Sequence, residues 1–125
     1  MTGIDGKALT VARDYVQAIA NKDVDKIMSL SADGVICTSP IGQIEGTAAF
    51  RKFHEGFARM IQNVTLLAAF GDDKQAVVVY EADTHPVPNA VTAELLQVKN
   101  GKLAATRVIY DATPFAAYMA SVPKH

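Results

Sequence analysis

Residues 90–110 read AVTAELLQVKNGKLAATRVIY, two runs of strand-forming residues separated by Asn100-Gly101. Both residues of this pair tolerate a positive φ angle, so the pair is the strongest short-range hairpin signal in the chain. Upstream, two further runs rich in Val, Leu, Ala and Tyr are separated by the turn-forming residues 71–73. The second half of the chain is therefore predicted to form an antiparallel meander. Its strands are residues 64–70, 75–84, 90–98 and 102–110.

The residues before the meander follow a helical period. Apolar side chains recur at steps of three and four from Leu9 to Ile19. This spacing predicts a helix from about Gly6 to Ala20, with Asp5 as its N-cap. Asp23 is predicted to cap a second, short helix that Asp33-Gly34 would end.

A brief strand at residues 35–38 is predicted to follow the second helix. A third helix then opens at Gly46-Thr47 and places four large apolar side chains on one face. These side chains are Phe50, Phe53, Phe57 and Met60. After the meander, Thr113-Pro114 opens a short C-terminal helix, because proline fits the first turn of a helix.

This order of elements is typical of α+β folds shaped like a cone. We expect one domain, residues 1–125, with three N-terminal helices packed on a strongly curved, mixed, mainly antiparallel sheet and a short C-terminal helix. Residues of both faces of the strands are apolar, as Val91 and Leu95 alternate with Thr92 and Leu96. Since helices cover only one face, we expect a homodimer through the other.

Composition excludes several classes of partner. The chain has 125 residues, 50% of them hydrophobic, and a net charge of -1. Its Lys and Arg residues are scattered, so neither nucleic acid nor a membrane surface is an expected partner. Cys37, the single cysteine, fits a reducing compartment, and we expect a cytoplasmic protein. His85 and His125 lack ligand spacing with Cys37 or the carboxylates, so we expect neither a metal nor a cofactor.

Four segments resemble the nuclear transport factor 2-like superfamily. They are YVQAIANKD (15–23), IMSLSAD (27–33), TSPIG (38–42) and GTAA (46–49). Within the superfamily they are similar to ketosteroid isomerases and SnoaL-like polyketide cyclases. RVIYDATPF (107–115) resembles the polyketide cyclase-like and limonene-epoxide hydrolase-like branches. The resemblance covers nearly the whole chain and implies a cone-shaped, cystatin-like fold with an apolar pocket. It does not define the activity, because one fold can host several functions.

The resemblance also implies catalytic roles for three residues. Tyr15 matches the tyrosine that donates a hydrogen bond to the ligand oxygen, and Glu94 falls near the acid that acts as second donor. Burial would raise the pKa of Glu94 and keep it protonated. His54 matches a tyrosine of the same network, and its pKa makes it the candidate to move the proton. The alternatives are a core tyrosine, a solvated glutamate and a histidine on the solvent side of its helix.

Ser39 stands where the isomerases have their aspartate base. A hydroxyl cannot move a proton between carbons unless another base activates it, so steroid isomerisation is not expected. The simpler interpretation of Ser39 is a turn residue before Pro40. Val108 stands where the epoxide hydrolases need an acid, which argues against epoxide opening. The residues predicted to contact the ligand are Ser31, Ser39, Phe53, Phe57, Thr106, Val108 and Tyr110.

Two classes of function follow from these residues. One is a cofactor-independent isomerase- or cyclase-like enzyme acting on a small apolar molecule with a carbonyl or hydroxyl group. The other is a non-catalytic module that uses the same cavity for binding, or the same sheet for dimerisation. The missing base favours binding. Tyr15 together with the acidic Glu94 favours an enzyme, because such groups are costly to bury.

Overall fold

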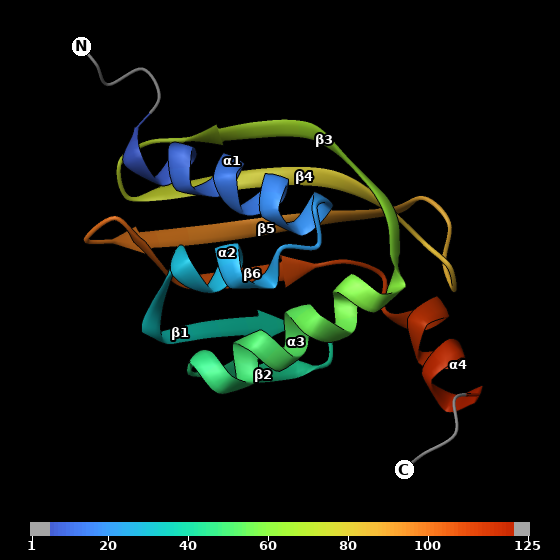
Figure 1. The fold of residues 1–125 in the computed structure, drawn as a ribbon. Coiled ribbons are helices and arrows are strands. Elements are labelled where there is room, and N and C mark those ends of the chain that lie inside the picture. The colour runs from blue at the N-terminus through green and yellow to red at the C-terminus, as the bar shows by residue number, and fades with distance from the viewer. Residues whose placement is uncertain (1–5, 122–125) are drawn as a thin grey trace.

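A six-stranded sheet forms the base of the protein in the computed structural model, which describes residues 6–121 (Figure 1). Its strands are β1 (Ser31–Ser39), β2 (Gly42–Glu45), β3 (Ile61–Gly71), β4 (Gln75–Thr84), β5 (Ala90–Lys99) and β6 (Lys102–Ile109). They lie in the order β2-β1-β6-β5-β4-β3. β1 and β6 are parallel and the other neighbours antiparallel, so the sheet is mixed and mainly antiparallel, as predicted.

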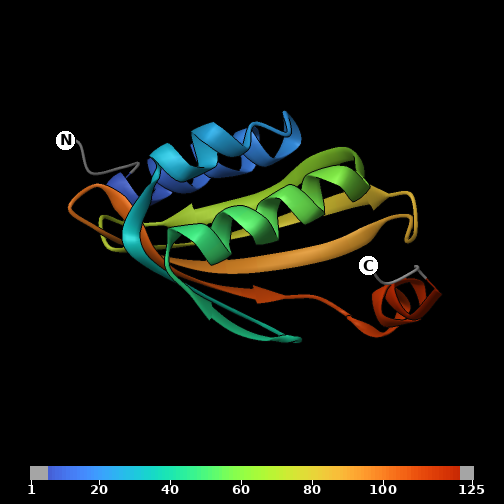
Figure 2. The same ribbon diagram turned by 60° about the horizontal axis from the view of Figure 1, so that its bottom comes forward.

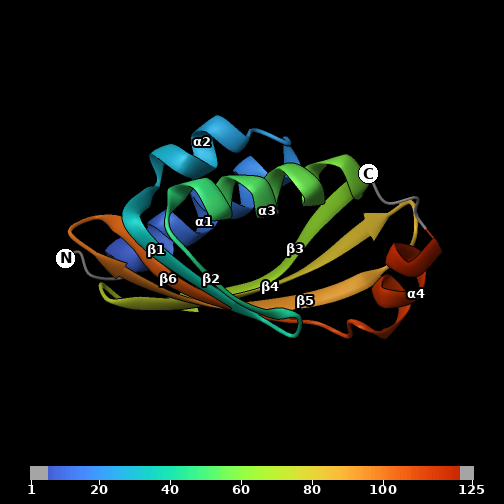
Figure 3. The same ribbon diagram turned by 90° about the horizontal axis from the view of Figure 1, so that it is seen from below.

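The helices divide into a layer on the sheet and a separate C-terminal element. They are α1 (Lys7–Ala20), α2 (Val24–Ser29), α3 (Thr47–Met60) and α4 (Thr113–Ser121). Figure 2 and Figure 3 show α1, α2 and α3 on one side of the curved sheet, with α4 beyond the end of β6. The predicted fold class, three helices on a curved sheet followed by a short helix, is confirmed.

The turn between β3 and β4 holds the start of α1. The carbonyl of Asp72 accepts hydrogen bonds from the amides of Ala8 and Leu9, at 3.0 and 3.3 Å. These bonds satisfy first-turn donors that would otherwise lack partners. Gly6 makes the close approach possible, because a Cβ there would lie 2.1 Å from the carbonyl carbon of Asp72. The predicted N-cap, Asp5, lies outside the described residues.

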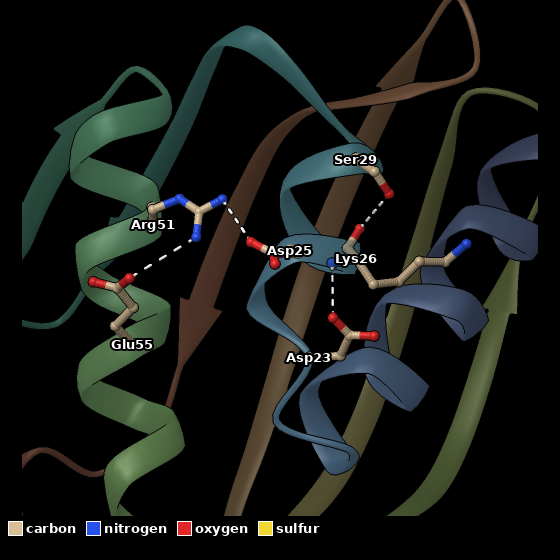
Figure 4. Close-up of polar contacts among 6 residues, drawn as sticks. All are labelled: Asp23, Asp25, Lys26, Ser29, Arg51 and Glu55. Atoms are coloured by element: carbon tan, nitrogen blue, oxygen red, sulfur yellow. Dashed lines mark hydrogen bonds and ion pairs between the residues drawn. The ribbon is translucent and has the colours of Figure 1, made fainter.

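The second helix is shorter than predicted. Asp23 caps it as expected, accepting a hydrogen bond of 3.0 Å from the amide of Lys26, but the helix ends at Ser29 (Figure 4). The side chain of Ser29 donates back to the carbonyl of Lys26 at 2.7 Å. Figure 4 also shows Arg51 of α3 paired with Asp25 of α2 at 2.9 Å, which ties the two helices together.

The segment after α2 forms a hairpin that the sequence did not predict in full. Asp33 and Gly34 lie inside β1 rather than at a helix end, and the pairing of β1 with β6 shifts register at this point. The Asp33-Gly34 pair, which predicted a helix end, lies instead at an irregularity within a strand. β2 was missed because the turn at Pro40 leaves it only four residues long, with Gly42 at a φ of 131°.

The meander agrees with the prediction in order and turns. Asn100 and Gly101 have φ angles of 52° and 76°, so both take the left-handed conformation that the hairpin requires. Residues 85–89 form the loop between β4 and β5. The strand bounds differ from the prediction mainly at β3, which begins at Ile61 rather than residue 64.

Alternation along the strands separates an inner face from an outer face. On β4 and β5 the inner side chains, such as Tyr80 and Leu96, are buried beneath the helices. The outer side chains include Phe70 at 72% exposure, Val91 at 55% and Ile109 at 54%. Large apolar side chains therefore remain uncovered on the outer face within the described residues.

Candidate functional site

A cavity of about 920 Å³ opens between α3, the inner face of the sheet and α4. The third helix contributes one wall through Phe53, Phe57 and Met60. β4, β5 and β6 contribute the opposite wall, and Phe115 of α4 contributes to the end. Apolar walls of this size with few polar groups are typical of sites for small molecules.

A carboxylate, Glu94, lies in this cavity wall. It is 1% exposed and accepts hydrogen bonds from three hydroxyl groups. Tyr15 and Thr106 each donate to its Oε1 at 2.8 Å, and Tyr80 donates to its Oε2 at 2.5 Å. Alternation on β5 brings Glu94 to the inner face, while the pairing of β5 with β6 places Val108 beside it.

The surroundings of Glu94 act on its charge in opposite directions. Burial raises the pKa of Glu94, and the hydroxyl donors, led by Tyr80 and followed by Thr106 and Tyr15, lower it, with burial the larger effect. Burial and the neighbouring Glu94 raise the pKa of both Tyr15 and Tyr80 well above ordinary values, so these phenols keep their protons. Glu94 is therefore a hydrogen-bond acceptor whose basicity is increased.

The imidazole of His54 is enclosed by aromatic rings. The rings of Tyr15, Phe50 and Phe53 meet it edge to face, with centroids 5.5, 4.7 and 5.2 Å away. Burial lowers the pKa of His54 from 6.5 to about 3, so it is neutral at physiological pH. Its Nε2 lies 3.1 Å from the hydroxyl of Tyr15. Since that hydroxyl donates to Glu94, we assign the proton to Nε2 of His54, which donates to Tyr15.

This result changes the role expected for His54. The sequence-based assignment of proton transfer to His54 assumed an ordinary histidine pKa. With its pKa lowered to about 3, the imidazole is a weak base. A chain of hydrogen bonds from His54 through Tyr15 to Glu94 instead orients the carboxylate.

The predicted ligand-contacting residues fall into three groups. Those that line the cavity are Phe53, His54, Phe57, Glu94, Val108 and Tyr110. Tyr15 and Thr106 lie behind Glu94 and reach the cavity only through it. Ser31 and Ser39 are elsewhere, which corrects their assignment as ligand contacts.

Hydrogen bonds explain the placement of both serines. The hydroxyl of Ser31 donates to the carbonyl of Ile27 at 2.8 Å and so satisfies the end of α2. The hydroxyl of Ser39 accepts from the amide of Ile41 at 3.3 Å within the β1–β2 turn. The turn interpretation of Ser39 fits this geometry.

The polar residues of the cavity that were not predicted as site residues are Lys52, Arg59, Tyr80, His85, Thr92 and Tyr118. Tyr80 holds Oε2 of Glu94, and Thr92 lines the cavity two residues before Glu94 on the same face of β5. Thr92 could have been predicted from the sequence, because side chains two residues apart on a strand lie on the same face and Thr92 is two residues before Glu94. Tyr80 could be placed only through the strand register, in which it pairs with Thr92.

The described part of the chain offers no candidate metal site and no candidate membrane-spanning helix. Within residues 6–121, no three His, Cys, Asp or Glu side chains come together in a group that could hold a metal ion. Over the same residues, no helix has the length and apolar character that crossing a bilayer requires.

A curved sheet covered by helices on its inner face, with a polar cluster inside an apolar cavity, is the architecture of nuclear transport factor 2-like proteins. The family model for the SnoaL-like domain matches residues 12–106. The chain therefore belongs to the SnoaL-like domain family. No curated protein sequence matches it.

Solved structures agree with this assignment. A protein from Kribbella flavida is 39% identical, with a TM-score of 0.86 over 91% of this chain and 94% of that one. A SnoaL-like protein of unknown function from Burkholderia thailandensis is 18% identical, with a TM-score of 0.73 over 84% and 95%. An LEH-like epoxide hydrolase from M. tuberculosis is 13% identical, with a TM-score of 0.72 over 91% and 90%. The last two show similarity of fold alone.

Proposed function

We propose that this protein binds a small apolar molecule with a carbonyl or hydroxyl group and transfers a proton on it, as a cofactor-independent isomerase- or cyclase-like enzyme. Glu94 is the base in this proposal, in place of the aspartate that Ser39 replaces. The observation that carries it is a buried carboxylate in the wall of an apolar cavity, held by three hydroxyl groups. Burying such a group is costly unless its charge is used.

The chemistry requires no oxidant or reductant. The carboxylate of Glu94 takes a proton from a carbon next to the ligand carbonyl, and the electron pair of that C–H bond forms the double bond of an enolate. The hydroxyls of Thr92 and Tyr110, which line the cavity, donate to the enolate oxygen. Return of the proton to another carbon of a conjugated ligand gives an isomer, while attack by the enolate carbon on a second carbonyl closes a ring.

Tyr15 and His54 act as positioning residues in this proposal. Tyr15 holds Oε1 of Glu94, and His54 holds the hydroxyl of Tyr15. Neutral His54 donates without adding a positive charge, which leaves the raised pKa of Glu94 intact. Both residues therefore tune the base without contacting the ligand oxygen directly.

The alternative is a module that binds the same ligand without turnover. Ser39 favours this alternative, because a relative that had lost its aspartate would retain the cavity and lose the reaction. The two functions differ in one measurable property, the exchange of a carbon-bound proton in the bound ligand.

Deuterium exchange separates the enzyme from the binding module. Tetralone, an apolar ketone with acidic protons beside its carbonyl, is incubated with the protein in deuterated buffer and followed by proton NMR. We expect exchange above the buffer rate with the native protein and a loss of about a hundredfold or more in Glu94→Gln. Glu81→Gln, the same change at a residue of β4 that does not line the cavity, should retain the exchange. Binding of tetralone with exchange at the buffer rate would contradict the enzyme and leave the binding module.

The outer face of the sheet supports a second part of the proposal, a homodimer. In the strand register Phe70 pairs with Val77 and Val77 with Leu95, a row that ends at Arg107 on β6, and in the adjacent row Ala93 pairs with Ile109. The same chain is an occupant with matching chemistry, since a two-fold axis brings one apolar face onto another. We also propose a cytoplasmic location, which the single buried Cys37 favours.

A further inference from the structure

The mouth of the cavity carries positive charge that the proposed reaction does not use. Lys52 and Arg59 of α3 both line the cavity and are exposed to solvent. They are seven residues apart, two helical turns, and so share one face of α3. Gly56 lies between them and also lines the cavity.

Neither cation has an acidic partner among the residues that the structure describes. Within residues 6–121 the ion pairs of α3 belong to Arg51, which contacts Asp25 and Glu55 at 2.9 and 3.9 Å. No ion pair in that range includes Lys52 or Arg59. The other face of the same helix therefore pairs its cation, whereas the face toward the cavity leaves its cations available to a ligand.

Gly56 keeps the space between the two cations open. A Cβ built at this position would lie 3.9 Å from Nη2 of Arg59, in ordinary van der Waals contact with the guanidinium. Any side chain longer than alanine would extend further into the space beside Arg59. Glycine in a helix interior is less favourable than alanine, so this helix keeps the space open at some loss of stability.

Charge is distributed unequally along the cavity. Of the described residues that line it, Glu94 is the only acid, and it lies in the buried wall. Arg59 in the last turn of α3 also suits the helix dipole, but Lys52, in the middle of the helix, has no such reason for its position. An anionic group on a ligand would be attracted to the mouth and repelled by Glu94, which fixes the direction in which the ligand enters.

We propose that the ligand is an apolar molecule with an anionic group at one end, and that Lys52 and Arg59 bind this group at the mouth while the apolar body fills the cavity. This inference rests on the proposed function, because it assigns the opposite end of the ligand to the neighbourhood of Glu94. Arg59 offers paired N–H donors that match a carboxylate, phosphate or sulfonate, and Lys52 adds a second positive charge.

Two probes with one skeleton test the inference. Anilinonaphthalene sulfonate and phenyl-naphthylamine share an apolar aromatic body, and the sulfonate is present only in the first. Both become fluorescent in an apolar environment, so their dissociation constants are measured by titration against the native protein. Ala90→Trp, which places a large side chain at the cavity wall, should weaken both probes and so locates them in the cavity.

The double variant Lys52→Gln/Arg59→Gln isolates the charge. We expect its affinity for the sulfonate probe to fall about five- to tenfold at low salt and its affinity for the uncharged probe to stay within twofold. The loss should shrink as salt is added, because exposed charges are screened. Lys74→Gln, a matched control that removes an exposed cation outside the cavity, should change neither probe.

Each outcome decides one question. A similar change for both probes, or no change for either, in the double variant would overturn the inference while leaving the cavity and the proposed function standing. Failure of the uncharged probe to bind the native protein would count against the proposed function itself. Thermal unfolding of the double variant near the native temperature shows that the protein is folded in each comparison.

Discussion

The two faces of strands β4, β5 and β6 are built from alternate residues of the same segments, and each face carries some side chains that are unusual for its surroundings. The inner face holds Tyr80, Glu94 and Thr106, all buried and joined by hydrogen bonds. The outer face holds Val91 and Ile109, both more than half exposed. The rest of the inner face is apolar, as Val78, Leu96 and Val108 show, so the polar cluster is an exception within it.

These exceptions are the places where each face departs from the pattern that stability alone would favour. Polar groups under the helices are stable only because each has a partner: among the described residues, no buried side-chain oxygen or nitrogen lacks one. Apolar groups on the outer face gain by burial against another surface. The inner face thus provides the candidate site, and the outer face provides the contact surface of the proposed dimer.

The largest expected effect is a loss of folding stability at low pH, caused by the buried His54. Its folded-state pKa, about 3, lies below the ordinary 6.5, so the folded state binds fewer protons and loses stability as pH falls from 6.5 towards 3. The shift corresponds to about 5 kcal/mol. His54→Gln, whose amide still donates to Tyr15, should unfold at a urea concentration that depends less on pH across this range.

His85→Gln is the control for that comparison. It removes an exposed histidine from the loop after β4 and leaves the buried imidazole in place. A native-like acid dependence in this variant, with a flatter one in His54→Gln, assigns the effect to His54. Equal acid dependence in all three proteins would contradict the assigned burial of a neutral imidazole.

A charge on the outer face should weaken the proposed dimer. Ile109→Arg replaces an exposed apolar side chain of this face with a guanidinium and should raise the dimer dissociation constant by about thirtyfold, near 2 kcal/mol. Sedimentation velocity over a range of concentrations measures this change. Gln17→Lys, on the exposed side of α1, adds a charge on the opposite side of the molecule and should leave the dimer unchanged. A native protein that sediments as a monomer at micromolar concentration would contradict the proposed dimer through the outer face.

Removing a hydroxyl from the inner face should have a smaller effect. Tyr15→Phe deletes the donor to Glu94 and the acceptor of His54, and we expect a loss of about 1–2 kcal/mol in the free energy of unfolding. Tyr110→Phe is matched in chemistry, but its hydroxyl faces the cavity, so the cost should be about 0.5 kcal/mol or less. Urea unfolding of both variants gives the difference, and equal losses would contradict the network.

The sequence predicted the fold better than it predicted the site. The hairpin at Asn100-Gly101 and the apolar spacing of α1 and α3 are local signals, and local signals fix the elements and their order. β2 was missed because four residues are too few to show a period. The extension of β1 through Gly34 depends on pairing with β6, which no local pattern records.

The site depends on register and on burial, and these are properties of the folded chain. The resemblance supplied Tyr15, His54 and Glu94, and it left a solvated Glu94 open as an alternative. Tyr80 joins the cluster only because β4 pairs with β5 at Thr92. The change of role for His54 follows from the three rings that enclose it, since they lower its pKa.

The central claim, that Glu94 is a buried base of raised pKa, is tested most directly by carbon NMR. The carboxyl resonance of Glu94, assigned as the signal lost in Glu94→Gln, is followed as pH rises from acid to alkaline. We predict a midpoint above about 4.3, the ordinary value for glutamate, and a further rise in Tyr80→Phe, which loses a donor to the carboxylate. A midpoint at or below the ordinary value, unchanged in Tyr80→Phe, would contradict the account.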